Sequence, residues 1–331
     1  MMLRLKFAIL TAATALAVAP ARAQDASAEA YGDFRYSLNY ADAGDTTHWA
    51  SANNASRFGV RGEVKGEKLA AFVDLQSGVS IDGEAGGVAF TQRIYVAGLR
   101  GAFGQVSFGR QNMAYKLAGL RLDPFYDTST LSTTAGVPVT GLFAGASFGL
   151  SELTNGFANR SLAYTSPDLH GVTLNAVGLL DPDGEHDFGV GGAFRREGLE
   201  VGVQYFDVRG GAAWAQTAGI DYAVRVHGQY TAPAKWSVGA SYEHIGDDVD
   251  GNLLYVSGTV TPVPPVTVAA SVGFLGGDTP FDGYTGVHAG VFYTLLPGVR
   301  VHALFSYVDV TDSEARANGA VGFSYQFVLK P

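Results

Sequence analysis

The stretch Gly32-Asp33-Phe34-Arg35-Tyr36-Ser37-Leu38-Asn39-Tyr40 decides the fold class of this chain. Glycine, aromatic and leucine residues stand at its even positions, and polar residues, Arg35 among them, stand at its odd positions. Because successive side chains of a strand point to opposite faces, a period of two predicts a β-strand with one apolar and one polar face. Residues 321–327 repeat the pattern, with Val, Phe, Tyr and Phe set against Gly, Ser and Gln.

Segments of the same kind fill the chain between these two. We expect fourteen of them, and with the first and last segments the predicted total is sixteen strands. Each runs for about ten residues, which is the length that a tilted strand needs to cross a bilayer. The fourteen begin near Arg57, Leu69, Ile94, Gln105, Ser161, Val172, Phe188, Leu199, Asp221, Trp236, Leu253, Val266, Val287 and Val299.

The connections between these segments alternate in length. Short links such as Gly66-Glu67, Glu197-Gly198 and Pro297-Gly298 alternate with longer, Asp- and Gly-rich links such as residues 41–55 and 246–252. Short turns at one rim and long loops at the other are typical of outer-membrane barrels. Since hydrocarbon offers no hydrogen-bond partner, such a sheet must also close on itself. The sequence therefore predicts an all-β fold, a 16-stranded antiparallel transmembrane β-barrel over residues 24–331.

The amino terminus indicates export. Arg4 and Lys6 precede an apolar run over residues 7–18, and Ala21-Arg22-Ala23 follows it. This is the pattern of a secretory signal peptide, so we expect residues 1–23 to be cleaved. The apolar run is too short for a spanning helix, which needs roughly twenty residues.

Composition excludes several classes of protein. The formal net charge is −9, and removal of the predicted signal peptide makes it more negative, which argues against nucleic acid as a partner. The chain has no cysteine, so neither a disulfide nor a cysteine metal site can hold it together. We expect no cofactor and no metal.

One connection stands apart from the others. Residues 111–158 show no convincing alternation, although compact domains rarely tolerate structureless loops beyond about fifteen residues. The lumen of a sixteen-stranded barrel is wide enough to hold such a segment. We therefore expect residues 111–158 to fold into the barrel as a constriction loop.

Three stretches resemble the Gram-negative general porin family: residues 54–62 (NASRFGVRG), 93–111 (RIYVAGLRGAFGQVSFGRQ) and 159–167 (NRSLAYTSP). The resemblance implies a homotrimer of outer-membrane channels, each with a third loop folded into the pore, that pass small hydrophilic solutes and ions by passive diffusion. It implies contact with outer-membrane lipid and lipopolysaccharide, and recognition by the barrel assembly machinery. It also implies a pore constriction with a basic wall at Arg57, Arg61 and Arg93 and an acidic loop at Asp123 and Asp127.

The alternation itself predicts which arginines face the lumen. Arg57 and Arg61 alternate with Phe58 and Val60, and Arg35 lies on the polar face of the first segment, so these three should point inward. By the same rule Arg93 and Tyr95 should face the lumen, with Ile94 and Val96 facing lipid. Arg110 has the parity of the apolar residues Val106 and Phe108, so it should face lipid unless a bulge intervenes or it lies beyond the hydrocarbon.

Other functions remain open at this point. His227, His288 and His302 share the lumenal parity but lack the spacing of a metal or catalytic site, so we do not expect an enzyme. A substrate-selective channel with a ligand site in the pore is the first alternative to a non-specific diffusion channel. A surface adhesin or receptor barrel is the second.

Overall fold

The computed structural model describes residues 25–42, 47–81, 90–128, 156–180, 184, 186–209, 220–233, 235–247, 250–278, 283–311 and 315–330. The predicted signal peptide, residues 1–23, lies outside the described residues, and so do residues 129–155 of the expected constriction loop. Among the described residues, no helix has the length and apolar character needed to cross a membrane.

In the described part of the chain, seventeen strands form one sheet in which neighbours are antiparallel. They are β1 (Asp25–Asp42), β2 (Thr47–Asn53), β3 (Arg57–Lys65), β4 (Leu69–Val79), β5 (Phe90–Gly101), β6 (Gly104–Gln111), β7 (Ala158–Thr165), β8 (Val172–Leu180), β9 (His186–Arg196), β10 (Leu199–Asp207), β11 (Ile220–Ala232), β12 (Trp236–Asp247), β13 (Asp250–Val263), β14 (Val266–Asp278), β15 (Tyr284–Leu296), β16 (Val299–Val310) and β17 (Arg316–Leu329).

The sheet closes into a barrel because its first and last strands pair. Residues Ala30–Ala41 of β1 lie opposite residues Asn318–Leu329 of β17. On its other edge, β1 pairs with β2 through Tyr36–Asp42 and with β3 through Asp25–Asp33. β2 and β3 therefore form one barrel strand, interrupted where Ala55 takes a positive φ of 56°. Counted this way, the barrel has the sixteen strands that the alternation predicts.

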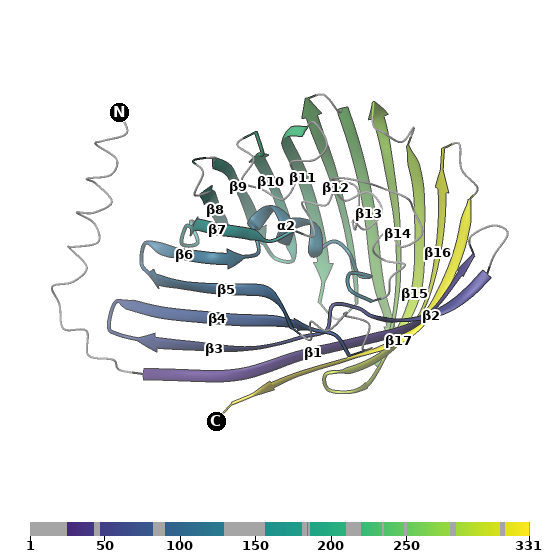
Figure 1. Ribbon diagram of the computed structural model, residues 1–331, viewed down its shortest axis with the longest axis horizontal. Coiled ribbons are helices and arrows are strands. Elements are labelled where there is room, and N and C mark those ends of the chain that lie inside the picture. The colour runs from purple at the N-terminus through teal and green to yellow at the C-terminus, as the bar shows by residue number, and fades with distance from the viewer. Residues whose placement is uncertain are drawn as a thin grey trace.

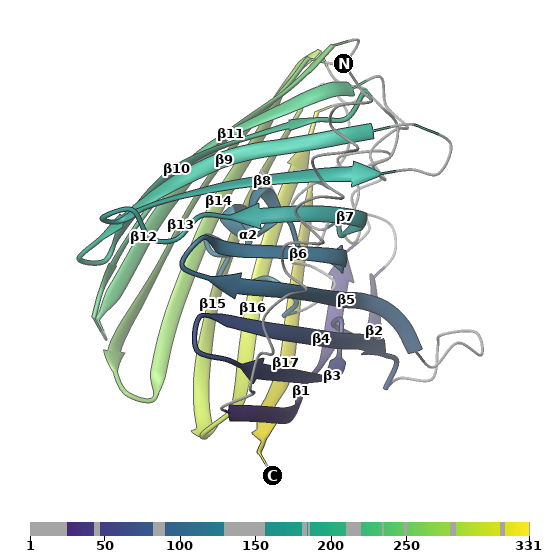
Figure 2. The same cartoon turned by 90° about the vertical axis from the view of Figure 1, so that its left-hand side faces the viewer.

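The two faces of the sheet separate apolar from polar side chains. Large apolar residues that alternate along each strand are exposed on the outside, as are Phe58 and Val60 in β3 and Val201 and Val203 in β10. Polar residues of the opposite parity are buried inside, among them Ser37, Asn39, Gln76, Gln204, Ser257 and Ser271. This is the arrangement that a barrel needs when lipid surrounds it and a polar lumen runs through it. Figure 2 shows the strands side by side around the curved wall.

Short turns join the strands at one rim, as the sequence predicts. Glu197 and Gly198 alone connect β9 to β10, and both have positive φ, of 50° and 86°. Two positive φ values characterise a type I′ turn, whose twist matches that of the flanking strands. Gly66, Gly101 and Gly298 lie in or beside three other short turns at this rim.

The segment that follows β6 enters the barrel. It forms the helix α2 (Ala114–Leu120), which lies inside the curve of the sheet against β9, β10 and β11 (Figure 1). Beyond the helix, Phe125 packs against Ala269 of β14 and Phe292 of β15 in a small apolar cluster. The described part of the predicted constriction loop is thus folded inward, as expected.

Several glycines of the wall make room for a neighbouring side chain of the lumen. A Cβ atom at Gly202 would lie 2.5 Å from the His227 ring, one at Gly322 would lie 2.6 Å from the His302 ring, and one at Gly59 would lie 2.6 Å from the Tyr31 ring. Real Cβ atoms do not come this close to a neighbouring atom, so any larger residue would displace the ring. These glycines therefore let the rings lie flat against the barrel wall.

Candidate functional site

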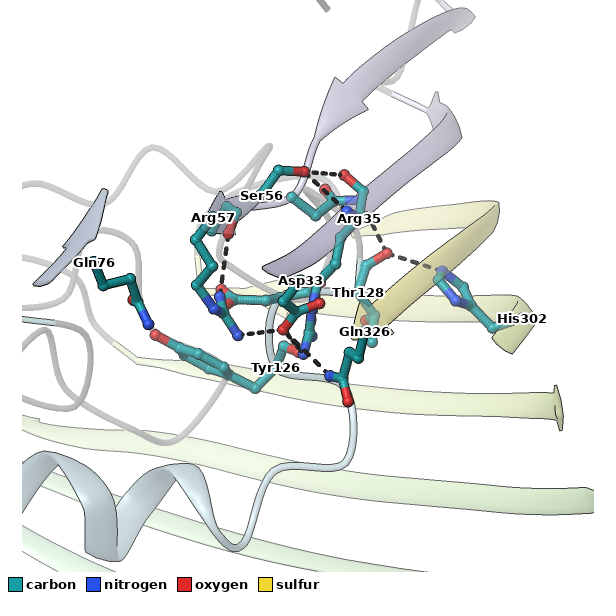
Figure 3. A network of polar contacts seen from close by, with 12 residues as sticks. Asp33, Arg35, Ser56, Arg57, Gln76, Tyr126, Thr128, His302 and Gln326 are labelled. Atoms are coloured by element: carbon teal, nitrogen blue, oxygen red, sulfur yellow. Dashed lines mark hydrogen bonds and ion pairs between the residues drawn. The ribbon is translucent and has the colours of Figure 1, made fainter. Parts of the chain in front are cut away.

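Two arginines and two aspartates meet where the constriction loop reaches the wall (Figure 3). Arg35 of β1 donates two hydrogen bonds to Asp33, both of 2.8 Å. Arg57 of β3 lies between two carboxylates, with Nη2 at 2.7 Å from Asp33 Oδ2 and Nη1 at 2.7 Å from Asp127 Oδ2. The four formal charges cancel, and all four side chains are less than one-fifth exposed.

The loop backbone is held at the same place. Arg35 Nη1 donates to the carbonyl oxygens of Tyr126 and Asp127, at 3.0 and 3.2 Å. The Thr128 carbonyl accepts hydrogen bonds from Asn54 Nδ2 at 3.1 Å and from His302 Nε2 at 2.9 Å. Residues 126–128 are thus fixed between β1, β3 and β16, as Figure 3 shows from close by.

Two other predicted site residues, Asp123 and Arg61, have different partners. Asp123 accepts hydrogen bonds from the Tyr255 hydroxyl of β13 at 2.8 Å and from the Phe125 backbone N–H at 2.9 Å, and it is buried. Arg61 is half exposed, forms an ion pair with Glu29 and lies over the Tyr31 ring. It lines a cavity of about 700 Å³ that also contains Lys330, at the rim of the short turns. The structure brings Arg35, Arg57 and Asp127 together. It places Asp123 on a cavity of about 310 Å³ that Arg35 and Asp127 also line, and it places Arg61 at the rim of the short turns.

A buried ion pair anchors α2 to the opposite side of the barrel. Arg225 of β11 and Glu243 of β12 are joined at 2.7 Å, and both side chains are 0% exposed. The Tyr115 hydroxyl donates to Glu243 at 2.5 Å, and the Tyr115 carbonyl accepts from Arg225 at 2.8 Å. Burial and the neighbouring carboxylate raise the pKa of the Tyr115 hydroxyl well above its usual value, so it remains a donor. The two charges thus compensate each other, and the Tyr115 hydroxyl and carbonyl add a hydrogen bond to each of them.

A β-bulge changes the predicted orientation of residues in β5. The register between β4 and β5 shifts between Gln76 and Ser77, so Val96 lies opposite Asp74 on the lumenal face and Tyr95 lies opposite Leu75 on the outer face. The expectation that Tyr95 faces inward and Val96 outward is therefore wrong. Arg93, at the bulge, still reaches the lumenal Gln76, with its Nε 3.2 Å from Gln76 Oε1. An extra residue in one strand reverses the parity beyond it, which periodicity alone does not reveal.

A second register shift, between Gly109 and Gln111 of β6, falls at Arg110, which stands opposite Tyr95 of β5. Its guanidinium lies 4.8 Å from the ring centroid of Phe157, and Arg93 lies 5.2 Å from the same centroid. The Lys116 ammonium group of α2 lies 3.6 Å from it. We refer to Arg93, Arg110, Lys116 and Phe157 as the Phe157 cluster.

Lys116 titrates in an unusual range. Burial lowers the pKa of the Lys116 ammonium group to about 7; Arg93, Arg57 and Arg110 act in the same direction and Asp127 in the opposite one. Lys116 thus exchanges between its charged and neutral forms near neutral pH.

Three residues of the site were not predicted, although the sequence contains a signal for them. Asp33 stands two positions before Arg35 on the same polar face, and Arg225 and Glu243 are charged residues within strands, where charge must face the lumen. Phe157 carries no such signal, because it ends a segment without alternation.

Comparison with known proteins identifies the family. The model of the family described as Gram-negative porin matches residues 10–313. The chain belongs to the Gram-negative porin family. No curated protein sequence matches the porin closely enough to count as a relative.

Solved structures share the fold of this porin at low sequence identity. The anion-selective porin from Comamonas acidovorans has a TM-score of 0.74 and 16% identity, over 92% of this chain and 100% of that one. The trimer form of in-vitro folded OmpT from Vibrio cholerae has a TM-score of 0.68 and 17% identity, over 92% and 100% of the two chains. Salmonella typhi OmpF, in complex with daunomycin, has a TM-score of 0.68 and 17% identity, over 91% and 97%.

Family membership and the closed barrel together establish the general function. The porin is a diffusion channel of the Gram-negative outer membrane and not an enzyme. The expected fold, function and location are confirmed.

Proposed function

We propose that this porin admits small hydrophilic solutes and ions past a constriction set by Arg35, Arg57 and Asp33 on the wall and by Asp127 on the loop. The observation that carries the proposal is the 2.7 Å contact between Arg57 and Asp127, which ties the loop to the wall 70 residues away. Because residues 114–128 of the loop are held there and at Arg225, they occupy a fixed part of the lumen and restrict the size of solute that can pass.

The electrostatics of this constriction follow from direct pairing. Opposite charges in contact cancel at a distance, so the cluster of Asp33, Arg35, Arg57 and Asp127 contributes a short-range dipole and little net field. Polar solutes can replace their bound water by hydrogen bonds to the side chains of this cluster. For apolar solutes, entry into a polar, hydrated passage is unfavourable in free energy.

Three further features belong to the same proposal. We expect residues 1–23 to be removed as a signal peptide. We expect a homotrimer, supported by the trimer form of the structurally similar Vibrio cholerae OmpT. We also expect the apolar outer face to contact lipid and lipopolysaccharide, and the barrel assembly machinery to recognise the chain.

The experiment combines planar-bilayer recording with liposome swelling, using the purified mature porin. A diffusion channel gives discrete conductance steps and uptake of neutral sugars that falls smoothly with their size. Uptake that is narrow and saturable would replace the proposal with a substrate-selective channel. A folded protein that produces no conductance steps and no uptake would support an adhesin or receptor barrel instead.

A further inference from the structure

The cavity of about 700 Å³ at the rim of the short turns lies apart from the constriction. Arg61 lines it, whereas Arg57 stands four residues earlier on the same strand, β3, and four residues of a strand span roughly 13 Å. The charged residues that line the cavity are three carboxylates and three cations, namely Glu29, Glu63, Asp74, Arg61, Arg100 and Lys330. Their formal charges cancel, so the cavity as a whole favours neither anions nor cations.

Two opposite charges of this cavity face each other across a pair of strands. Arg61 of β3 stands directly opposite Asp74 of β4, but in the described part of the chain the two do not form an ion pair. Arg61 instead pairs with Glu29 of β1 and lies 5.2 Å from the centroid of the Tyr31 ring. Asp74 accepts a hydrogen bond of 2.6 Å from the Tyr31 hydroxyl. Each charge is thus held in place by a partner other than the charge opposite to it.

These contacts leave part of each charged group available to a solute. Arg61 bonds Glu29 through Nε, and within the described residues its two Nη groups have no hydrogen-bond partner. Asp74 accepts from Tyr31 through Oδ1, and its Oδ2 atom likewise has no partner among the described residues. The Arg61 side chain is 50% exposed, so a solute in the lumen can reach it.

The spacing of the two available groups suits a solute whose own charges are close together. Residues directly opposite in an antiparallel pair have Cβ atoms about 5 Å apart. An α-amino acid carries its ammonium and carboxylate groups on a single carbon atom, so two side chains at this spacing can bind both groups at once. The guanidinium fork matches a carboxylate, and the Asp74 oxygen accepts from an ammonium group. Val96 of β5 stands opposite Asp74 and also lines the cavity, so it offers an apolar neighbour to the side chain of the solute.

We propose that this cavity binds free α-amino acids in their zwitterionic form, with the carboxylate held by Arg61 and the ammonium group by Asp74. The proposal rests on the porin function and adds to it a class of solute that pauses between the constriction and the rim of the short turns. The site selects by the distance between two charges and not by net charge. Because Glu29 and Tyr31 already hold the two side chains, binding requires little further ordering of them.

The test is single-channel recording of the purified porin in potassium chloride, with leucine and ε-aminocaproate as probes. The two probes are isomers with the same two charges, but ε-aminocaproate carries them at opposite ends of its chain. Leucine should reduce the current saturably. The concentration for half-maximal reduction should be about three- to tenfold higher for ε-aminocaproate, as expected for loss of one charge-assisted contact in a hydrated site. N-acetyl-leucine, which has no ammonium group, should also bind more weakly than leucine.

Variants of the two charged residues assign the contacts. Arg61→Gln should raise the leucine concentration for half-maximal reduction about three- to tenfold. Asp74→Asn keeps an acceptor for the Tyr31 hydroxyl and should weaken leucine binding to a similar extent. It should also abolish the difference between leucine and N-acetyl-leucine, because the partner of the ammonium group is then lost.

Arg196→Gln and Glu197→Gln are the matched controls. Each removes one charge from the short turn between β9 and β10, where the two side chains are 73% and 84% exposed. Neither should change the effect of leucine on the current. Folding of every variant is checked by the change in electrophoretic mobility on heating.

The outcomes distinguish this inference from the function on which it rests. Conductance steps without a saturable effect of leucine would overturn the amino-acid site and leave the channel intact. Equal effects of leucine and ε-aminocaproate would also overturn it, because the spacing of the charges would then not matter. Absence of any conductance would instead contradict the proposed function itself.

Discussion

Among the contacts that attach the described part of the constriction loop to the barrel, two differ in burial and in chemistry. At α2, the Arg225–Glu243 pair is fully buried and is capped by Tyr115. At the loop tip, Arg57 and Asp127 keep a small exposed fraction, share their charges with Asp33 and Arg35, and border the lumen. The first attachment is suited to holding the loop in place, and the second to contact with passing solutes.

The largest effect should come from breaking the buried attachment. In Arg225→Met the Glu243 carboxylate stays buried without its cation, so the free energy of unfolding should fall by about 3 to 5 kcal/mol. The measurement is denaturant-induced unfolding of the porin from lipid vesicles. The double variant Arg225→Met/Glu243→Leu should recover much of the loss, since it leaves no unpaired charge. A double variant as unstable as the single one would show that the pair itself, rather than its imbalance, stabilises the barrel.

A smaller effect, on ion preference rather than stability, should follow from unbalancing the loop tip. In Asp127→Asn, the reversal potential in a salt gradient should show a greater permeability to anions. In Arg57→Gln, it should show a greater permeability to cations. Each shift should correspond to about a fivefold change in permeability ratio, on the order of 1 kcal/mol for one charge in a hydrated pore.

Asp123→Asn provides the control for Asp127→Asn. Both variants remove one carboxylate from the loop, but Asp123 accepts hydrogen bonds from Tyr255 and the Phe125 backbone, whereas Asp127 is paired with Arg57. Its removal should leave the reversal potential nearly unchanged. Equal shifts of the reversal potential in the two variants would mean that a carboxylate paired with Arg57 affects ion passage no more than one elsewhere in the loop.

The smallest effect should be a dependence of ion preference on pH. Because the pKa of Lys116 is lowered to about 7, its positive charge is present at pH 6 and largely lost at pH 8.5. Arg93 of β5, Arg110 of β6, Arg57 of β3 and Asp127 of the loop act on it. The three arginines stay charged throughout this range. Preference for anions should therefore weaken by about twofold as pH rises, with a midpoint near 7.

Two substitutions at Lys116 identify the source of this pH dependence. Lys116→Met should remove the dependence and hold the porin at its high-pH preference. Lys116→Arg should keep the low-pH preference at both pH values, because arginine stays charged. A midpoint that survives in Lys116→Met would assign the titration to another group, and the lumenal histidines would be the next residues to replace.

The sequence was sufficient for the barrel and for part of the site. Alternation is a local property, so it correctly placed Arg35 and Arg57 on the lumenal face, and the contrast of short and long connections predicted closure. The resemblance to porins supplied Asp127 as a loop carboxylate. Asp123, named on the same grounds, lies instead against the wall at Tyr255, where the loop turns.

The rest depends on contacts that no local pattern encodes. A bulge adds one residue to a strand without a distinctive composition, so the parity of Tyr95 could not be predicted from alternation. Phe157 and Lys116 meet although they lie far apart in the sequence. From the sequence, Arg225 and Glu243 could be recognised only as two charged residues in strands. Their contact with Tyr115 could not be predicted, because Tyr115 is more than a hundred positions away.

The glycines beneath the rings of Tyr31, His227 and His302 have a consequence for the calibre of the channel. Each of these glycines lacks a side chain that would push the neighbouring ring away from the wall. The width of the lumen therefore depends on backbone positions that bear no charge and touch no solute. A side chain at one of these positions, as in Gly202→Ala, would tilt the His227 ring towards the barrel axis. Molecular sieving could thereby be tuned independently of ionic preference.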